Sequence, residues 1–261
     1  MDVKKYALIT GASAGIGYDL AKMAGADGRN LILVARSAEK LNALAVELRK
    51  NNDTEVVTIP VDLSDEKGVN KLLDEIASQN LKIDILVNNA GFGDFGDFSK
   101  ADLSKNMEMI RLNIGALTQL THAIMQQMLG SGKGRIMNVA STAAFLPGPG
   151  MAVYYASKAY VLSFSEALSR ELKGSGVTVT ALCPGPTDTS FATAAGLGKS
   201  LMHRMLPPAT SAEVAKAGYK AMMKGKTIEI PGFMNKLTAI TPRLTPRSIV
   251  RNMIYGIHKK H

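Results

Sequence analysis

Short apolar runs alternate with longer segments of helical periodicity along most of the chain. Seven runs rich in Val, Ile and Leu cover residues 6–10, 31–35, 56–60, 84–88, 135–140, 177–182 and 227–230. Between them, segments such as 38–50 and 153–173 repeat apolar positions every three to four residues. Strands buried on both faces form continuous apolar runs of this kind. The alternation therefore predicts an α/β fold: a doubly wound parallel sheet of Rossmann type with helices on both faces.

The same pattern predicts one domain over residues 1–261, because no linker or repeat of fixed period interrupts it. Residues 187–211 form the longest break in the alternation and are rich in small residues and Met. A connection of that length is usually functional, so we expect a substrate loop or lid there. Residues 231–261 form a basic, Pro-punctuated C-terminal extension.

Composition narrows the possible classes of protein. The chain has 261 residues, of which 46% are hydrophobic, and one cysteine, Cys183. These values exclude a disordered chain and a disulfide scaffold, and they favour a reducing, cytoplasmic compartment. No apolar run reaches the roughly 18 residues of a membrane-spanning helix. The four histidines have no metal-type spacing to one another or to Cys183, so we expect no metal site; they are His122, His203, His258 and His261.

The net charge of +9 lies entirely in the last part of the chain. Residues 1–200 hold 20 Lys and Arg against 20 Asp and Glu, whereas residues 201–261 hold 11 against 2. The excess is compatible with an anionic partner, such as a phosphate-bearing substrate, an acidic protein or a lipid surface, and equally with a solvated basic face. We expect no nucleic-acid partner.

A glycine-rich loop follows the first apolar run directly. Its sequence is Thr10-Gly11-Ala12-Ser13-Ala14-Gly15-Ile16-Gly17. Glycines at these positions allow a sharp turn and a close approach of the backbone to a pyrophosphate, and the following helix N-terminus binds the anion. Because the loop follows the first strand of an alternating chain, a dinucleotide site is favoured over a simple tight turn.

The end of the second predicted strand indicates which dinucleotide binds. An NAD-type site presents a carboxylate there to the ribose hydroxyls, but this chain has Arg36, nineteen residues after Gly17. A guanidinium suits a 2′-phosphate, so NADP(H) is the predicted cofactor. The alternative is an ordinary surface arginine.

Tyr154 and Lys158 lie four residues apart in a predicted helix, so they share a face. A nearby cation stabilises phenolate and makes the phenol a usable acid or base. Neighbouring Tyr155 has Ala159 at the same offset and lacks that cation. Ser141 ends a predicted strand thirteen residues before Tyr154, where its hydroxyl can hold a substrate carbonyl oxygen.

With these motifs in order, the chain resembles the short-chain dehydrogenase/reductase family from about residue 4 to about residue 192. The resemblance rests on the glycine loop, Asn88-Asn89-Ala90-Gly91, Pro184-Gly185 and a tetrad of Asn113, Ser141, Tyr154 and Lys158. It implies that Tyr154 is the general acid and base, that Lys158 lowers its pKa, that Ser141 orients the carbonyl and that Asn113 holds a water. The implied cofactor residues are Gly11, Ser13, Gly15, Ile16, Gly17, Arg36, Asp62, Asn89, Ala90, Gly91, Tyr154, Lys158, Pro184, Gly185, Thr187 and Thr189.

Two of these positions also have explanations that involve no function. Asn113 is equally explained as a helix-interior side chain bonded to backbone, and Asp62 as a helix cap in Asp62-Leu63-Ser64-Asp65. Within the family, residues 92–96 and 147–149 resemble a bacterial subgroup whose substrates are largely unsettled. Homodimers and homotetramers are usual in the family.

We therefore expect an NADP(H)-dependent carbonyl reductase that acts on a small carbonyl or alcohol, or on an acyl thioester. The alternative is an NADP-binding regulatory or membrane-surface protein without significant turnover. In the extension, Thr245-Pro246 predicts a helix start, and Ile249, Val250 and Met253 begin an apolar stripe beside Arg247 and Arg251. Such a helix suits an anionic membrane, although packing on the core or on a second subunit is favoured.

Overall fold

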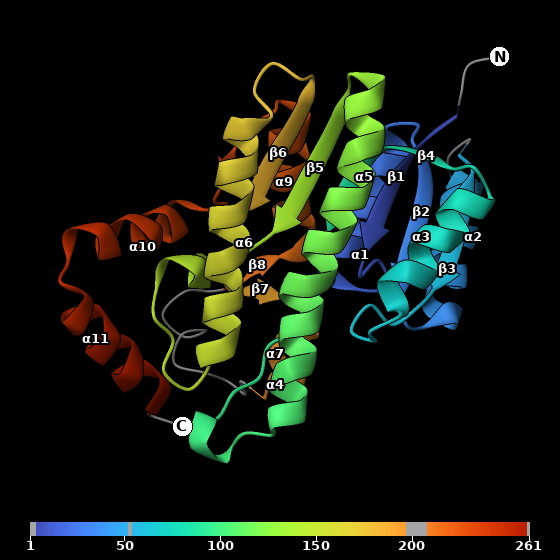
Figure 1. Cartoon of the computed structure of the whole chain (residues 1–261). Helices are drawn as coiled ribbons and strands as arrows, with labels where there is room; N and C mark the ends of the chain where they lie inside the picture. The colour runs from blue at the N-terminus through green and yellow to red at the C-terminus, as the bar shows by residue number, and fades with distance from the viewer. Residues whose placement is uncertain (1–3, 52–53, 197–207, 260–261) are drawn as a thin grey trace.

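A seven-stranded parallel sheet forms the centre of the computed structural model, which describes residues 4–51, 54–196 and 208–259 (Figure 1). Its strands are β1 (Lys5–Thr10), β2 (Asn30–Ala35), β3 (Val56–Pro60), β4 (Lys82–Asn88), β5 (Gly134–Val139), β6 (Val177–Leu182) and β9 (Ile228–Glu229). They lie in the order β3-β2-β1-β4-β5-β6-β9. The predicted α/β fold is confirmed, and each predicted apolar run coincides with a strand to within two residues.

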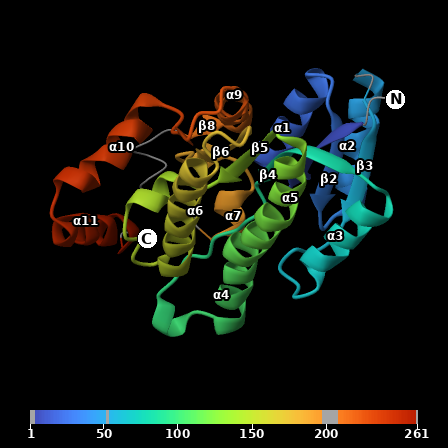
Figure 2. The ribbon, with the colours of Figure 1, turned by 45° about the horizontal axis from the view of Figure 1, so that its top comes forward.

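Helices cover both faces of the sheet (Figure 2). One face packs against α1 (Gly15–Ala26), α2 (Ala38–Asn51) and α9 (Ser211–Met223). The other packs against α3 (Gly68–Ser78), α5 (Leu117–Ser131) and α6 (Ala152–Glu171). Alternate side chains of β1 divide between the two cores, Ala7 and Ile9 toward the first and Tyr6 and Leu8 toward the second. This two-sided burial explains why the strands are apolar throughout.

The remaining elements lie around the carboxyl edge of the sheet and at its β9 side. They are η1 (Phe98–Lys100), α4 (Leu103–Ile110), the π-helical turn η2 (Arg111–Ala116), η3 (Thr142–Phe145), β7 (Thr187–Asp188), α7 (Phe191–Ala194), β8 (Ala209–Thr210), α10 (Phe233–Leu244) and α11 (Arg247–Lys259). Two of these regions differ from expectation. The connection predicted over 187–211 contains a two-stranded pair, β7 with β8, and α7. The extension contains two helices where one was predicted.

The strand order reverses between β1 and β4, whose connections leave in opposite directions. At such a switch point the carboxyl ends of neighbouring strands open a crevice, which is where open α/β sheets bind ligands. Thr10 and Asn88 end these two strands, and the predicted glycine loop starts from the first of them. In the described residues, no helix is long and apolar enough to cross a membrane.

Candidate active site

The glycine loop joins β1 to α1 with two glycines in the left-handed region, Gly11 at φ +66° and Gly15 at φ +57°. A side chain at Gly17 has no space, because its Cβ would lie 2.4 Å from Asn89 Nδ2. Ala14 precedes α1, and no side chain caps the helix. The first-turn N–H groups therefore have no side-chain acceptor, an arrangement suited to an anion. Ser13 and Ile16 are half-buried in the same loop.

Thr10 and Asn89 hold this loop against the end of β4. The Thr10 hydroxyl accepts hydrogen bonds from the backbone N–H groups of Asn89 and Ala90, both at 3.0 Å. Asn89 Nδ2 donates to the Thr10 and Gly11 carbonyls at 2.9 and 3.2 Å. The described contacts of the Asn89 amide are thus to the loop, which it positions. Thr10 is a site residue that the sequence did not single out, although its place immediately before the glycine loop was a usable signal.

Arg36 and Asp62 lie just beyond β2 and β3, at the same edge of the sheet. Arg36 Nη1 is 3.9 Å from Asp62 Oδ2, and the arginine side chain is 75% exposed. Asp62 Oδ1 accepts from Ser64 N and Oγ at 2.9 and 2.6 Å. Burial raises the pKa of Asp62, but the Ser64 hydrogen bonds and the Arg36 charge outweigh it and lower the pKa below its usual value. The helix-cap alternative for Asp62 is wrong, because α3 begins only at Gly68.

Ser141, Tyr154 and Lys158 meet at the carboxyl end of β5. Ser141 stands before η3, where its Oγ accepts from Ala143 N at 3.1 Å. Tyr154 and Lys158 occupy one face of α6, with the lysine Nζ 5.8 Å from the tyrosine ring centroid. Lys158 Nζ donates to the Val139 carbonyl at 2.8 Å. Both side chains are buried, so their protonation depends on the protein rather than on bulk solvent.

Burial is the main cause of the pKa shifts of Tyr154 and Lys158. It raises the pKa of the Tyr154 phenol to about 12, and a hydrogen bond with Ser141 acts in the opposite direction. Burial also lowers the pKa of the Lys158 ammonium to about 8. These shifts move the two pKa values apart, so burial favours the neutral phenol at Tyr154 and disfavours the charged form of Lys158. The Cys183 thiol lies close by, but burial raises its pKa to about 12, so it stays protonated and unreactive near neutral pH.

Asn113 lies in the π-helical turn η2, and both it and Lys158 approach Gly91. A Cβ placed at Gly91 would be 2.9 Å from Asn113 Oδ1 and 3.5 Å from Lys158 Nζ. The Asn113 amide donates to the Phe92 carbonyl at 2.9 Å and to Ser157 Oγ at 3.1 Å, and it accepts from Phe92 N at 3.2 Å. These bonds match the alternative of a buried asparagine satisfied by its surroundings. Because Gly91 has no side chain, Asn113 and Lys158 can both lie close to its backbone.

The segment after β6 runs along the same edge. The Pro184 carbonyl accepts from Thr142 N at 2.8 Å, and Thr187 Oγ1 donates to the Gly185 carbonyl at 3.0 Å. Thr189 reaches the glycine loop, since a Cβ at Gly15 would lie 3.0 Å from its methyl group. The Pro-Gly element, β7 and the glycine loop therefore border one region.

An aromatic side chain missed by the sequence interpretation covers Tyr154. The Phe191 ring of α7 lies 5.3 Å from the Tyr154 ring between centroids. A Cβ at Gly93 would meet Phe191, Met151 and Tyr154 at 2.9, 3.2 and 3.2 Å. No motif marks Phe191, because only the fold brings α7 over α6. Residues 197–207 of the predicted lid, with Met202 and Met205, lie outside the described part of the chain.

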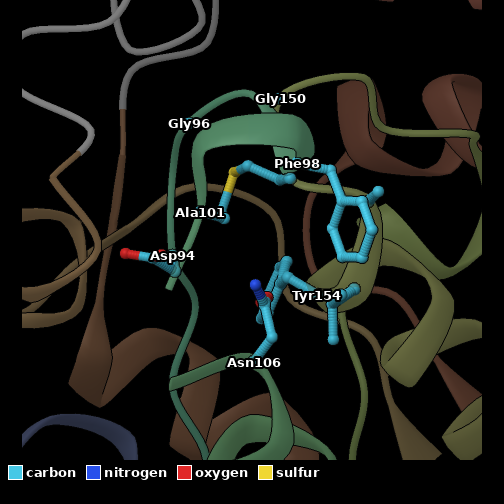
Figure 3. Close-up of a pocket in the computed structure, with 10 residues that line it drawn as sticks. Asp94, Gly96, Phe98, Ala101, Asn106, Gly150 and Tyr154 are labelled. Atoms are coloured by element: carbon cyan, nitrogen blue, oxygen red, sulfur yellow. The ribbon is translucent and has the colours of Figure 1, made fainter. Parts of the chain in front are cut away.

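A small cavity of about 10 Å³ lies beside Tyr154 (Figure 3). Its walls come from the loop after β4, from η1 and α4, and from the loop at Gly150 with the first turn of α6. A hydrogen bond from Gly96 N to the Gly150 carbonyl at 2.8 Å joins two of these walls, and one from Phe95 N to the Ala195 carbonyl at 3.0 Å joins the loop after β4 to the end of α7. Tyr154 itself is packed among aromatic and aliphatic side chains, including Met109, Met151 and Phe191.

Comparison with known proteins identifies the family. The family model for short chain dehydrogenases matches residues 5–199. The chain belongs to the short-chain dehydrogenase family. Among curated relatives, sulfoacetaldehyde reductase 2 of Chromohalobacter salexigens is 39% identical over 186 residues, covering 70% of this chain and 73% of that protein. The chain is thus an oxidoreductase of this family by membership, as the sequence motifs predicted.

Two solved members of the short-chain dehydrogenase family show which cofactors the fold accepts. A short-chain dehydrogenase from Sphingobium yanoikuyae in complex with NADPH is 32% identical, with a TM-score of 0.82 and coverage of 93% of this chain and 94% of that one. A member from Burkholderia phymatum in complex with NAD is 25% identical, with a TM-score of 0.80 and coverage of 93% and 92%. Family membership therefore indicates a nicotinamide cofactor and leaves the choice between NAD and NADP to the residues of this chain.

Proposed function

We propose that this protein is an NADP(H)-dependent oxidoreductase that interconverts a carbonyl and a secondary alcohol. The observation that carries the proposal is the meeting of Ser141, Tyr154 and Lys158 beside the glycine loop at one edge of the sheet. The bound nicotinamide would supply or accept the hydride. The protein's part is then to hold the carbonyl and to move one proton.

In the proposed reduction, the Ser141 hydroxyl holds the carbonyl oxygen and the Tyr154 phenol donates a proton to it. The alkoxide that forms as hydride reaches the carbon becomes the alcohol, and Tyr154 becomes phenolate. Lys158 supplies the positive charge that stabilises phenolate, which burial alone strongly disfavours. In the oxidation direction Tyr154 acts as the base. Asn113 holds the backbone at Phe92 and thereby positions the wall next to Lys158.

Arg36 supports the choice of NADP(H) over NAD(H). Its guanidinium is exposed at the end of β2, where a 2′-phosphate would lie, and it has only a long contact of 3.9 Å with Asp62. The uncapped start of α1 suits the pyrophosphate. Within the same proposal, Gly11, Ser13, Gly15, Ile16 and Gly17 hold the phosphates.

The other predicted cofactor residues contribute to the same proposal from neighbouring strand ends. Ala90, Gly91, Pro184, Gly185, Thr187 and Thr189 would contact the ribose and nicotinamide. Asp62 would contact the adenine, and Asn89 would position the glycine loop.

The substrate we propose is a small carbonyl compound or alcohol, with acyl thioesters as one candidate class. The aromatic and aliphatic side chains around Tyr154 support an apolar group next to the carbonyl. Exposed apolar side chains on α4, Leu103 and Met107, support a homodimer or homotetramer. A cytoplasmic location stays a prediction.

The test is NADPH consumption, followed by absorbance, over ketones, aldehydes, quinones and 3-oxoacyl thioesters, with NADH in parallel. We expect turnover with at least one class and a preference for NADPH. NADPH binding without consumption by any class would instead support the regulatory alternative. A clear preference for NADH would contradict the proposed role of Arg36.

A further inference from the structure

The helix α10 presents its apolar side to solvent. Phe233, Leu237, Ile240 and Leu244 follow at spacings of four, three and four residues, which places them on one face. Their exposed fractions are 73, 42, 53 and 84%. An ordinary surface helix buries such a stripe against the core. This stripe therefore lacks the covering that its composition indicates.

The opposite side of α10 is the one in contact with the protein. Ala239 is buried, and Asn235 lies against Gly185, with its Nδ2 donating to the Pro231 carbonyl at 2.7 Å. The helix also packs on η3, the turn that follows Ser141. Its inner contacts are thus small and polar, and they fix the apolar stripe outward. The stripe lies close to the candidate active site.

The second helix of the extension continues this surface. In α11, Val250 and Ile254 are buried, whereas Ile249 and Met253 are exposed one turn apart. Together α10 and α11, which we call the terminal arm (residues 233–259), project beyond α6 in both views (Figures 1 and 2). The predicted apolar stripe of this helix is thus packed on the protein at Val250 and Ile254, whereas Ile249 and Met253 are exposed in the single chain.

Positive charge accompanies the exposed apolar side chains. Residues 231–261 contain six Lys and Arg and no Asp or Glu. The side chains of Lys236, Arg247 and Arg251 are exposed, and among the described residues none of the three takes part in an ion pair. The terminal arm is therefore both apolar and cationic and has no acidic side chain. Such a surface complements a partner in which an apolar interior is bordered by anionic groups.

We propose that the terminal arm docks on an anionic membrane surface. The stripe of α10 enters the boundary between headgroups and acyl chains, and the cations contact lipid phosphates. A twelve-residue helix is about 18 Å long, too short to cross the roughly 30 Å hydrocarbon core, so the contact is peripheral. A second copy of the chain is the less favourable occupant, because a symmetric pairing of this surface brings the same cations against one another.

Co-sedimentation of the full chain with vesicles tests the proposal. The vesicles contain phosphatidylcholine and phosphatidylglycerol in a three-to-one ratio, and phosphatidylcholine vesicles serve as the uncharged comparison. We expect binding to the anionic vesicles at low salt and a loss of at least about tenfold near 1 M salt, where the Debye length is about 3 Å. Equal binding to both kinds of vesicle, or none to either, would overturn the proposal.

A stripe variant separates the apolar contribution from folding. Replacement of Leu237, Ile240 and Leu244 by Gln removes exposed side chains only, so the fold should persist; we expect binding to fall more than about tenfold. The matched control replaces Val46 of α2 and Leu129 of α5 by Gln, because both are exposed apolar side chains outside the terminal arm, and it should bind like the wild type. Turnover of a water-soluble carbonyl should be unchanged in both. If the control loses as much binding as the stripe variant, the arm is not the docking surface.

A charge variant and a control of equal net charge test the cations. The variant reverses Lys236, Arg247 and Arg251 to Glu. Its control reverses three exposed lysines: Lys216 and Lys220 of α9 and Lys224 directly after it. We expect the first to lose vesicle binding and the second to keep most of it. Light scattering measures the oligomeric state of the wild type and of the stripe variant. If the wild type does not bind vesicles and the stripe variant dissociates from an oligomer, the proposal is overturned and the surface is assigned to a second copy of the chain.

Discussion

The strongest consequence of the buried ammonium is that Lys158 destabilises the protein while serving the proposed reaction. Burial lowers the pKa of Lys158 to about 8 from the model-compound value of 10.5. At neutral pH the lysine is charged in the folded and unfolded chain, so the folded state carries the cost of burying that charge. A shift of this size corresponds to about 3 kcal/mol.

Lys158→Met removes that cost and keeps a flexible side chain of similar length. The substitution also removes the hydrogen bond from the charged Lys158 Nζ to the Val139 carbonyl, which costs about 2 kcal/mol. We therefore expect the variant to be more stable than the wild type by about 1 kcal/mol at pH 7 while its turnover is lost. Such an exchange of stability for function is typical of active-site groups.

The pH dependence distinguishes this cause from better packing. Between about pH 8 and 10.5 the unfolded chain holds a proton on Lys158 that the folded chain has released, so wild-type stability rises with pH across that window. The advantage of the variant should shrink, and near pH 10 the ammonium penalty falls to about 1 kcal/mol. Urea unfolding at pH 7 and pH 10 measures both values. The exposed Lys216→Met is the control and should stay within about 0.5 kcal/mol of wild type.

Two results would refute this reasoning. One is a Lys158→Met variant no more stable than the wild type at pH 7. The other is a stability gain that does not diminish as the pH rises to 10, since a gain from packing alone is independent of proton release.

Three further predictions concern the cofactor and the carbonyl. Arg36→Asp should shift the kcat/KM preference from NADPH toward NADH, because a carboxylate accepts from ribose hydroxyls and repels a phosphate; an unchanged ratio would remove Arg36 from the site. Gly17→Ala should weaken NADPH binding at least about tenfold in a fluorescence titration, because its Cβ meets Asn89 Nδ2 at 2.4 Å; normal binding would show that the loop tolerates the shift. Ser141→Ala should lower kcat about 100-fold with little change in NADPH affinity, and steady-state kinetics would refute this if kcat is retained.

The sequence was sufficient for the sheet because its strands are buried on both faces. Strands β1, β2, β4, β5 and β6 are buried apolar runs of this kind, so they could be located without tertiary information. The two-residue strands β7 and β8 carry no periodicity and could not. The helix α10 was not predicted, because Pro242 lies inside it. Its apolar stripe also faces solvent, whereas an amphipathic helix is normally expected to bury that stripe.

The candidate site was predictable in its chemistry and less so in its contacts. Tyr154 and Lys158 share a helical face by spacing alone, and the strand end at Ser141 follows from the fold class. The cover that Phe191 forms over Tyr154 depends on how a loop after β6 folds back on α6, which no local pattern encodes. The contacts of Asn89 with the Thr10 and Gly11 carbonyls likewise arise between residues about eighty positions apart.

The most direct test of the central claim is the turnover of Tyr154→Phe with NADPH and the best carbonyl from the panel, measured beside Tyr155→Phe. The two tyrosines are adjacent on α6 and both are buried. Comparing the two variants therefore distinguishes the loss of the Tyr154 hydroxyl from the general effect of removing a buried tyrosine hydroxyl. We predict that Tyr154→Phe binds NADPH like the wild type and loses at least about 100-fold in kcat, while Tyr155→Phe keeps most of its activity. Retention of near-normal kcat in Tyr154→Phe would contradict the mechanism.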